Sequence, residues 1–401
     1  HPAWSRMKFD ELLAQQLSMR VSHERRGKRA APALPPRGHL STRLIASLPF
    51  DLTPAQHRVL AEIRADLNRP HPMQRLLQGD VGSGKTIVAA AAALQAIEND
   101  WQVAVMAPTE ILAEQHFVKF DAWLRPLGID VVWVCGGQKK RERETARSRL
   151  VSGEAMIAVG THALIQDTIE FKRLGLSIVD EQHRFGVRER LALAQKTTDG
   201  IEPHRLMMSA TPIPRTLAMS FYADLDVSVI DMLPPGRTPI TTKLVAANRR
   251  DEVVTRVRDA CLAGGQAYWV CPLIEECDTL QLQTALATHA AIQETFPELR
   301  VGLVHGRLPS AEKAEVMAAF KAGELQLLVA TTVIEVGVDV PNATLMVIEN
   351  AERMGLAQLH QLRGRVGRGR EASACILMYE TALSATARAR LKIIYENTDG
   401  F

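Results

Sequence analysis

The residues from Gly79 to Thr86 have the types and the spacing of a loop that binds a phosphate group. They read Gly-Asp-Val-Gly-Ser-Gly-Lys-Thr, fit the pattern GxxxxGKT, and lie between an apolar run typical of a strand and one typical of a helix. The glycines let the backbone curl so that its N–H groups face a phosphate at the positive end of the helix. Lys85 is expected to reach the β- and γ-phosphates, and the Thr86 hydroxyl to bind Mg²⁺. The predicted nucleotide contacts in this loop are Gly79, Gly82, Ser83, Gly84, Lys85 and Thr86. The alternative, a glycine-rich turn that happens to precede Lys-Thr, requires eight specified positions to coincide.

An acidic pair follows a second apolar run. Leu176–Val179 ends in Asp180-Glu181-Gln182-His183, about 95 residues after the loop. Adjacent carboxylates at the end of a strand suit ATP hydrolysis, in which Asp180 holds Mg²⁺ through water and Glu181 polarises the attacking water. By itself the sequence also fits a solvated acidic turn. Ser209-Ala210-Thr211 ends the next strand and is a candidate element for coupling hydrolysis to movement.

Arginines interleaved with glycines occupy residues 358–370 near the carboxyl end. Such a tract could bind nucleic acid. The sharper hypothesis is that Arg365 and Arg368 reach the γ-phosphate, where a guanidinium stabilises the charge that develops during transfer.

Length and composition limit the classes of protein that can carry these residues. A chain of 401 residues predicts two large domains. A net charge of +3 neither requires nor excludes nucleic acid, so a binding surface must come from local arrangement. The five cysteines form no CxxC pair and favour a reducing cytosol. The longest apolar run is far shorter than the roughly 20 residues of a membrane span, so a soluble protein that does not contact a membrane is expected.

Short apolar runs alternate with helical patterns on both sides of a proline-rich segment at 233–239. This alternation predicts an α/β fold, with a parallel doubly wound sheet in each domain and function at the carboxyl ends of the strands. The first domain is expected at 48–235 and the second at 236–401. The predicted strands are Gln102–Ala107, Asp130–Cys135, Met156–Gly160, Leu176–Val179, Arg205–Met208, Ala267–Cys271, Val301–His305, Leu325–Ala330, Thr344–Ile348 and Ala374–Met378.

Residues 1–47 are expected to form a helix and a linker. Apolar side chains at Phe9, Leu12, Leu13 and Leu17 share one face of a helix over about Lys8–Arg20, which predicts packing on one of the two predicted domains or on a preceding segment. The basic run 24–29 and the following prolines are typical of a solvated linker, with DNA contact as the alternative. Thr53 and Pro54 predict the start of the next helix.

The order of these motifs resembles that of superfamily-two helicases, over nearly all of 48–380. Longer strings resemble the RecG family of ATP-dependent DNA helicases within it. They are GDVGSGKT from Gly79, APTEILAEQH from Ala107, DEQHRFGV from Asp180, SATPIPRTLA from Ser209 and RMGLAQLHQLRGRVGRG from Arg353. The transcription-repair coupling translocases carry a similar motor, but Glu110, Gln182 and the Arg353–Gly355 segment favour the RecG family.

The resemblance implies two RecA-like lobes and assigns roles residue by residue. Gln56 would recognise adenine, and Arg365 and Arg368 would act as arginine fingers. The implied DNA contacts are Pro108, Thr109, Thr161, His162, Thr331 and Thr332, although Thr109 and Thr161 could merely cap helices. The implied coupling residues are His183, Ser209, Thr211, Gly337, Asp339 and Gln361.

The resemblance also implies a function. RecG-type helicases use ATP and Mg²⁺ to remodel branched DNA, by fork regression and branch migration, in recombination and repair. Duplex or branched DNA is the expected partner, with replication or repair proteins as further candidates, for a monomer in the bacterial cytosol or nucleoid. The amino-terminal wedge domain and the carboxyl-terminal translocation motif of the family have no counterpart here, so the motor alone is expected. The remaining alternatives are a transcription-repair coupling motor and a non-enzymatic, ATP-gated DNA-binding switch.

Overall fold

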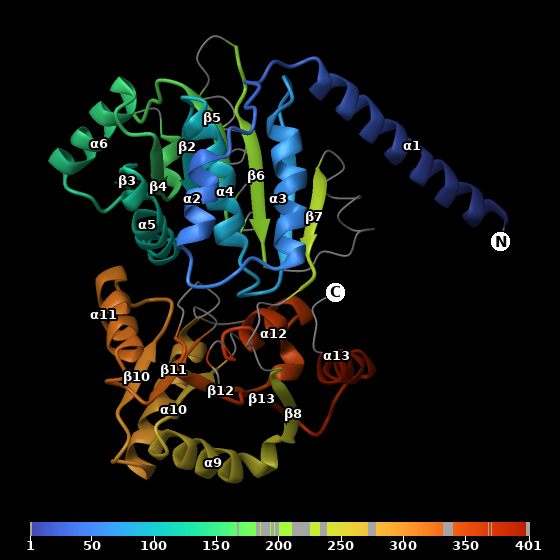
Figure 1. Cartoon of the computed structure of the whole chain (residues 1–401). Coiled ribbons are helices and arrows are strands. Elements are labelled where there is room, and N and C mark those ends of the chain that lie inside the picture. The colour runs from blue at the N-terminus through green and yellow to red at the C-terminus, as the bar shows by residue number, and fades with distance from the viewer. Residues whose placement is uncertain are drawn as a thin grey trace. The chain divides into compact units, whose positions relative to one another are not determined.

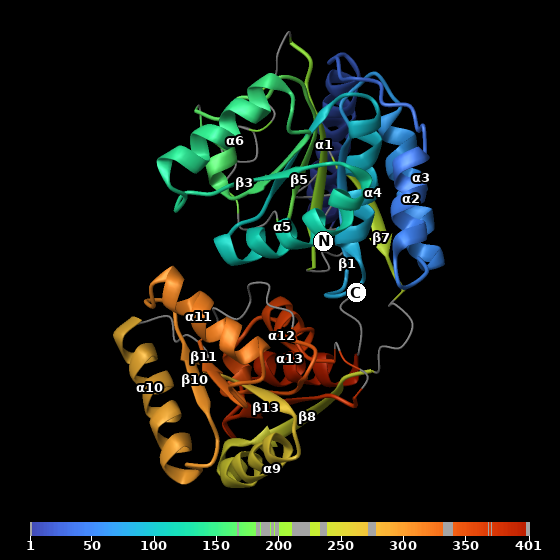
Figure 2. The same cartoon turned by 60° about the vertical axis from the view of Figure 1, so that its left-hand side comes forward.

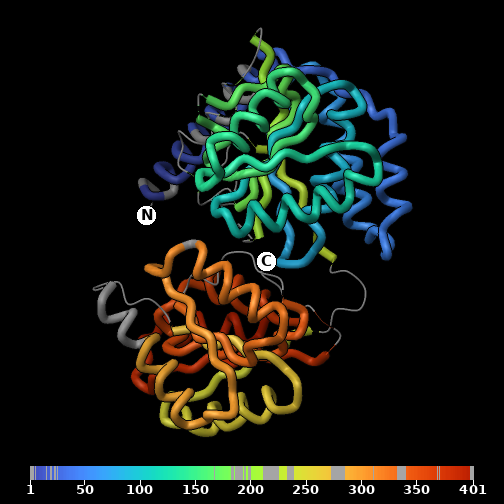
Figure 3. Tube along the Cα trace, turned by 90° about the vertical axis from the view of Figure 1, so that its left-hand side faces the viewer, coloured from blue at the N-terminus to red at the C-terminus, as the bar shows by residue number. Residues whose placement is uncertain are grey.

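The computed structural model consists of two α/β units that follow one another along the chain, as the trace in Figure 3 shows. The structure describes residues 2–166, 168–181, 185, 193, 196, 200–210, 225–232, 239–271, 278–331, 340–367, 369 and 371–397. Lobe 1 lies within His1–Gly79 and Ser83–Leu233, and lobe 2 within Asp80–Gly82 and Pro234–Gly400. In the part of the chain that the structure describes, no helix is long and apolar enough to cross a membrane.

Lobe 1 is built on a seven-stranded sheet in the order β3-β4-β2-β5-β6-β1-β7, in which every pair is parallel. Its strands are β1 (Gln74–Gly79), β2 (Gln102–Met106), β3 (Val131–Val134), β4 (Ile157–Gly160), β5 (Leu174–Val179), β6 (His204–Ser209) and β7 (Asp226–Ile230). Its helices are α1 (Pro2–Gly27), α2 (His39–Ser47), α3 (Pro54–Leu67), α4 (Lys85–Glu98), α5 (Glu110–Leu124) and α6 (Lys140–Ser152), with short 3₁₀ turns at Arg125–Leu127 and His162–Ile165.

Side chains alternate between the two faces of this sheet, as the pleat of a strand requires. Leu77 and Val105 point into a core shared with α2, α3, α4 and α5, whereas Leu76 and Met106 point into a second core that includes residues of α6. Figure 1 shows α2, α3 and α4 in front of the strands. With both faces covered, the central strands contain apolar runs, although β1 and β6 begin with polar residues, and these runs made them recognisable from sequence.

Lobe 2 is a six-stranded parallel sheet in the order β10-β11-β9-β12-β13-β8. Trp269 faces a core with α9 and α10, while its neighbour Tyr268 packs on Phe320 of α11 on the opposite face, with ring centroids 5.0 Å apart. Figure 2 shows α9 and α11 on either side of the strands. The strands are β8 (Thr241–Ala246), β9 (Gln266–Val270), β10 (Val301–Val304), β11 (Leu327–Ala330), β12 (Ala343–Ile348) and β13 (Ala374–Tyr379). The helices are α9 (Arg250–Leu262), α10 (Asp278–Thr295), α11 (Ser310–Lys321), α12 (Leu356–Arg363) and α13 (Ala385–Glu396), with 3₁₀ turns at Ala247–Arg249 and Ala351–Arg353.

All ten predicted strands are present, and the prediction of two parallel doubly wound sheets is confirmed. The segment at 233–238, where the domain boundary was predicted, lies outside the described residues, so the exact domain bounds stay a prediction.

The predicted solvated linker holds for only part of its segment. Helix α1 continues to Gly27, and Arg26 is buried and pairs with Asp226 at 3.1 Å, whereas Lys28 and Arg29 are exposed. Leu34 is fully buried in the core of lobe 1, and its N–H donates to the carbonyl of Leu67 at 2.8 Å. The segment is ordered on lobe 1 because it carries apolar side chains among its prolines and because its amides find acceptors near the end of α3.

The apolar face of α1 is exposed. Phe9, Leu12, Leu13 and Leu17 are 46–61% exposed, so they do not pack on lobe 1, to which α1 belongs. The expectation that they pack on the other lobe or on a wedge domain stays a prediction.

Candidate nucleotide and DNA sites

The glycine-rich loop between β1 and α4 has the backbone that its sequence predicts. Gly82 and Gly84 adopt the left-handed conformation, with φ of 81° and 86°, which side chains other than glycine disfavour. A Cβ on Gly84 would lie 2.2 Å from Nε2 of Gln56, and one on Gly79 would lie 2.5 Å from Oγ of Ser83. The loop therefore requires glycine at both positions.

The features that would receive a phosphate meet at the start of α4. The first N–H groups of a helix have no acceptor within the helix and favour an anion. The Oγ of Ser83 is buried and has no hydrogen-bond partner within the described residues, and Lys85 donates from Nζ to the carbonyl of Gly79 at 2.6 Å. An unpartnered buried hydroxyl and an ammonium that meets a backbone carbonyl are what a phosphate-binding loop presents in the absence of its ligand, so these residues fit a nucleoside triphosphate.

Gln56 links α3 to this loop. Its Oε1 accepts from the N–H of Thr53 at 2.8 Å in a capping box, and its Nε2 donates to the carbonyl of Ser83 at 2.8 Å. The predicted helix start at Thr53 and Pro54 is confirmed. The structure thus gives Gln56 a positioning role beside the loop, and its contact with adenine stays a prediction.

Asp180 follows β5 and is buried on the same edge of the sheet. Its Oδ2 lies 2.7 Å from Nε2 of His116 on α5, and its Oδ1 accepts from the N–H of Glu181 at 3.0 Å. Burial by itself raises the pKa of the Asp180 carboxyl, but the hydrogen bond and charge of His116 and the charge of Lys85 outweigh it and hold that pKa below its ordinary value. Asp180 is therefore a carboxylate at neutral pH and lies within electrostatic reach of the loop lysine.

Glu181 has an unusual backbone. Its φ is 47°, in the left-handed region that a glutamate rarely adopts and that costs about 1–3 kcal/mol. Strain of this kind is concentrated at functional sites. The turn places two consecutive carboxylates at the end of β5, as the sequence predicts.

Ser209 ends β6, which lies between β1 and β5 in the sheet. It is opposite Gln78 in the register with β1 and is buried, so it lies between the loop and the acidic pair. The other predicted coupling residues of this lobe, His183 and Thr211, lie outside the described residues.

No group of three or more His, Cys, Asp or Glu side chains within the described residues could hold a metal ion. Mg²⁺ usually keeps several waters and takes only one or two carboxylates together with the phosphates of the substrate. Asp180 and Thr86, next to the loop, fit that kind of site.

The predicted DNA contacts of lobe 1 follow two neighbouring strands. The N–H of Ala107 donates to the carbonyl of Gly160 at 3.0 Å, which brings Pro108 and Thr109 next to Thr161. Thr109 caps α5, with its Oγ1 accepting from the N–H of Leu112 at 3.4 Å. The capping alternative thus holds for the Thr109 side chain.

Thr161 differs from Thr109. Although it precedes a 3₁₀ turn, its side chain makes no capping bond, and its Oγ1 is buried with no hydrogen-bond partner among the described residues. His162, the next residue, is exposed. The capping alternative thus does not hold for Thr161, whose hydroxyl would reach a ligand only if the groups that cover it moved.

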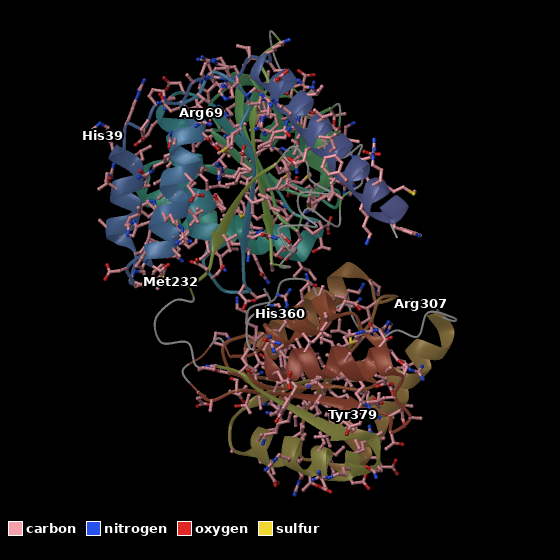
Figure 4. The ribbon with its side chains drawn as sticks, turned by 90° about the vertical axis from the view of Figure 1, so that its right-hand side faces the viewer. His39, Arg69, Met232, Arg307, His360 and Tyr379 are labelled. Carbon is pink, nitrogen blue, oxygen red and sulfur yellow. The ribbon has the colours of Figure 1, made fainter. Side chains whose placement is uncertain are left out.

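Lobe 2 repeats this feature. Thr331 follows β11, and its Oγ1 is also buried, with no hydrogen-bond partner in the part of the chain that the structure describes. Its N–H donates to the carbonyl of Val304 at 3.2 Å, which places it beside the loop of His305, Gly306 and Arg307 after β10. Arg307 is labelled in Figure 4. The sequence analysis did not single out this loop as a candidate site. The sequence signal that could have identified it is a basic, glycine-containing segment directly after a buried strand.

The arginine tract is divided by the structure. Arg363 is buried and structural, because its Nη1 donates to the carbonyls of Ile394 and Asn397 at 2.9 and 2.7 Å and ties α12 to the end of α13. Arg365 follows α12, with its N–H donating to the carbonyl of Leu362, and Gln361 lies on α12. The predictions for Arg368, Thr332, Gly337 and Asp339 fall outside the described residues.

Family models match both lobes. The model described as DEAD/DEAH box helicase matches residues 53–220, and the one described as helicase conserved C-terminal domain matches residues 252–370. The chain is 57% identical over 403 residues to the ATP-dependent DNA helicase RecG of Escherichia coli (strain K12), covering 100% of this chain and 58% of that relative. It is 47% identical over 399 residues to RecG of Aquifex aeolicus (strain VF5), covering 99% of this chain and 50% of that relative. The chain therefore spans less than two thirds of the length of these relatives.

Solved structures show the same likeness. The structure of RecG bound to a three-way DNA junction matches with a TM-score of 0.83 at 44% identity, over 99% of this chain and 52% of that one. Dbp5 of S. cerevisiae bound to RNA and ADP BeF3 matches with a TM-score of 0.67 at 15% identity, over 91% of this chain and 92% of that one, which supports the fold alone.

Proposed function

Because the chain belongs to the RecG-type helicases of superfamily two, we propose that it is the ATP-driven motor of a DNA helicase that remodels branched DNA in recombination and repair. The observation that carries this proposal is the buried Asp180 carboxylate at the edge of the sheet that also presents Lys85 and the glycine-rich loop. These are the parts that ATP hydrolysis requires, arranged as the family likeness implies.

In this proposal the loop holds the triphosphate. The N–H groups at the start of α4 and the Ser83 hydroxyl receive phosphate oxygens, and the Lys85 ammonium moves from the Gly79 carbonyl to the β- and γ-phosphates. The Thr86 hydroxyl and Asp180, the latter through water, would hold Mg²⁺. A bound Mg²⁺ neutralises charge on the phosphate oxygens.

Glu181 lies directly beside Asp180 and is placed to accept a proton from, and so polarise, the attacking water. Ser209 ends β6, which lies between the strand before the glycine-rich loop and the strand before the acidic pair, so a movement of the acidic pair would be transmitted to it. Arg365 and Arg368 remain proposed arginine fingers. Arg363 is not a candidate, because its guanidinium is used within lobe 2.

DNA would be bound through its phosphates. Among the described residues the Thr161 and Thr331 hydroxyls have no hydrogen-bond partner, and each follows a strand at the carboxyl edge of its sheet. Both hydroxyls are buried, so contact with DNA would require the groups that cover them to move. A hydroxyl can donate to a phosphate oxygen without reading the base, which suits a motor that must move along any sequence. Pro108, Thr109 and His162 would extend this contact in lobe 1.

The proposal is tested by measuring ATP turnover of the chain with linear duplex DNA, single-stranded DNA, RNA and a model fork in parallel. We expect duplex-containing DNA to stimulate turnover most. Stimulation by RNA alone would exclude a DNA motor, and tight DNA binding that depends on ATP without any turnover would indicate an ATP-gated switch.

A further inference from the structure

Helix α5 joins two places to which function is assigned above. It begins at Glu110, directly after Thr109, and its buried face consists of Ala113, His116, Phe120 and Leu124. His116 comes six positions after Glu110, which corresponds to about 9 Å along the helix axis. One end of the helix thus lies at the proposed DNA contacts, and His116 lies at Asp180.

The contact between His116 and Asp180 is short and enclosed. Nε2 of His116 lies 2.7 Å from Oδ2 of Asp180, with 6% and 12% of the two side chains exposed. Among the described residues, Nδ1 of His116 is buried with no hydrogen-bond partner, so Asp180 is the contact that holds the ring. A carboxylate can only accept, so Nε2 of His116 donates to Asp180. Phe120 packs edge-on against the imidazole, with the ring centroids 6.5 Å apart.

This hydrogen bond fixes the direction in which Asp180 points. The other carboxylate oxygen is held by the N–H of Glu181, so one restraint comes from the turn itself and the other comes from α5. Partners of this kind orient a ligating carboxylate, and their loss typically lowers metal affinity or activity 10- to 100-fold.

The amino-terminal end of α5 is linked to the end of β4, the strand that precedes Thr161. Ala107 donates to Gly160, and Thr109 caps the helix. A packed helix moves as a unit, so a phosphate that shifts its first turn also shifts His116 relative to Asp180.

We propose that His116 is a positioning residue that orients Asp180 and, through α5, couples DNA binding to nucleotide binding. This inference rests on the proposed function. Because coupling of two binding sites is reciprocal, bound nucleotide must change DNA affinity by the same factor by which DNA changes nucleotide affinity. That factor can be measured without hydrolysis.

The test uses the whole 401-residue chain and three variants. His116→Phe keeps a ring but removes the donor, and His116→Gln keeps an N–H donor. His204→Gln is the matched control, because His204 is a fully buried histidine of the same lobe with two hydrogen bonds, to Met73 and Pro32. Fluorescence anisotropy gives the affinity for labelled duplex DNA with and without a non-hydrolysable ATP analogue and Mg²⁺, and a fluorescent analogue gives nucleotide affinity in Mg²⁺ and in EDTA.

We expect His116→Phe to reduce the nucleotide-dependent change in DNA affinity to within about twofold of none, and to weaken nucleotide binding about 10- to 100-fold in Mg²⁺ but not in EDTA. His116→Gln should recover most of both effects, and His204→Gln should retain both. If His116→Phe showed the same nucleotide-dependent change in DNA affinity as the wild type, the inference would be overturned and the proposed function would stand. The same would follow if His204→Gln lost this change as fully as His116→Phe does. A wild-type chain that binds neither ATP analogue nor DNA would overturn the proposed function itself, and the inference with it.

Discussion

Replacement of Gly84 by alanine tests the geometry of the phosphate-binding loop most directly. Gly84 has φ of 86°, and its missing Cβ leaves room for the amide of Gln56. An alanine in the left-handed region costs about 1–2 kcal/mol. A Cβ 2.2 Å from Nε2 must also displace Gln56 and break its 2.8 Å bond to the Ser83 carbonyl, and a buried group left without its partner costs about 1–3 kcal/mol.

The two effects together disfavour the observed loop by about 2–5 kcal/mol. The free loop can escape this strain by changing conformation, but bound nucleotide requires the observed one, so the strain appears as lost affinity. At about 1.4 kcal/mol for each factor of ten, Gly84→Ala should weaken binding of a fluorescent ATP analogue at least about 30-fold.

Gly128→Ala is the matched control. Gly128 also has a left-handed φ, of 80°, but a Cβ there would meet nothing within 4 Å. This change should lower the free energy of unfolding by about 1–2 kcal/mol and leave nucleotide affinity unchanged. A double-mutant cycle adds Gln56→Ala, in whose background Gly84→Ala should cost less because the clash is gone. If Gly84→Ala bound nucleotide within threefold of wild type while Gly128→Ala lost stability as expected, the loop would not be the rigid cradle described here.

Four further outcomes are expected. Lys85→Ala should abolish ATP turnover without changing the melting temperature, and near wild-type turnover would refute the assignment of the loop. Glu181→Gln and Arg368→Ala should bind nucleotide yet lose hydrolysis by about 10³-fold or more; if Arg368→Ala lowered only DNA affinity, that arginine would belong to a nucleic-acid surface. DNA binding should fall steeply with salt and should hardly distinguish a fork from linear duplex, because phosphate contacts carry no structural specificity, so a strong fork preference would place junction recognition in the motor. Burial lowers the pKa of His204 to about 4, so the unfolded chain binds an extra proton between pH 6.5 and 4 and stability should fall by about 3 kcal/mol as pH drops through that window. Urea unfolding at pH 7 and pH 4.5 should show a smaller difference for His204→Gln, and an unchanged difference would refute this cause.

The interior strands could be predicted from sequence because both faces of each sheet are covered and most of these strands contain an apolar run. The two strands that sequence reasoning missed, β7 and β8, lie at sheet edges, as do β3 and β10, which were predicted. The difference lies in composition. The edge strands β3 and β10 read Val-Val-Trp-Val and Val-Gly-Leu-Val, whereas polar side chains interrupt the apolar pattern in Asp-Val-Ser-Val-Ile and Thr-Thr-Lys-Leu-Val-Ala. An edge strand is therefore recognisable only where it keeps an apolar run.

The candidate site was predictable only where its chemistry is local in sequence. The glycine-rich loop and the acidic pair are short strings, and both are found where the sequence places them. His116 was missed because it lies 64 residues from its partner, and on α5 it has the spacing of an ordinary buried helix position. Arg363 shows that sequence cannot separate the arginines of one tract by role. Its neighbours suit phosphate binding by their spacing, but the guanidinium of Arg363 holds two helices together.

Six strands follow the same order in the two lobes, and lobe 1 adds β7 at one edge, so the helices that follow β1 and β8 can be compared. In lobe 1, β1 lies beside β6 and leads into α4; in lobe 2, β8 lies beside β13 and leads into α9. After β1 the chain forms a glycine-rich loop, and α4 opens with Lys85 and Thr86, which leaves the positive helix end open to an anion. After β8 the chain forms a 3₁₀ turn without glycine, and α9 opens with Asp251 and Glu252 in its first turn. Those carboxylates already satisfy the positive end of the helix and would repel a phosphate. The first turns of these two equivalent helices therefore favour α4 over α9 as the place for a phosphate, in line with the nucleotide site proposed in lobe 1.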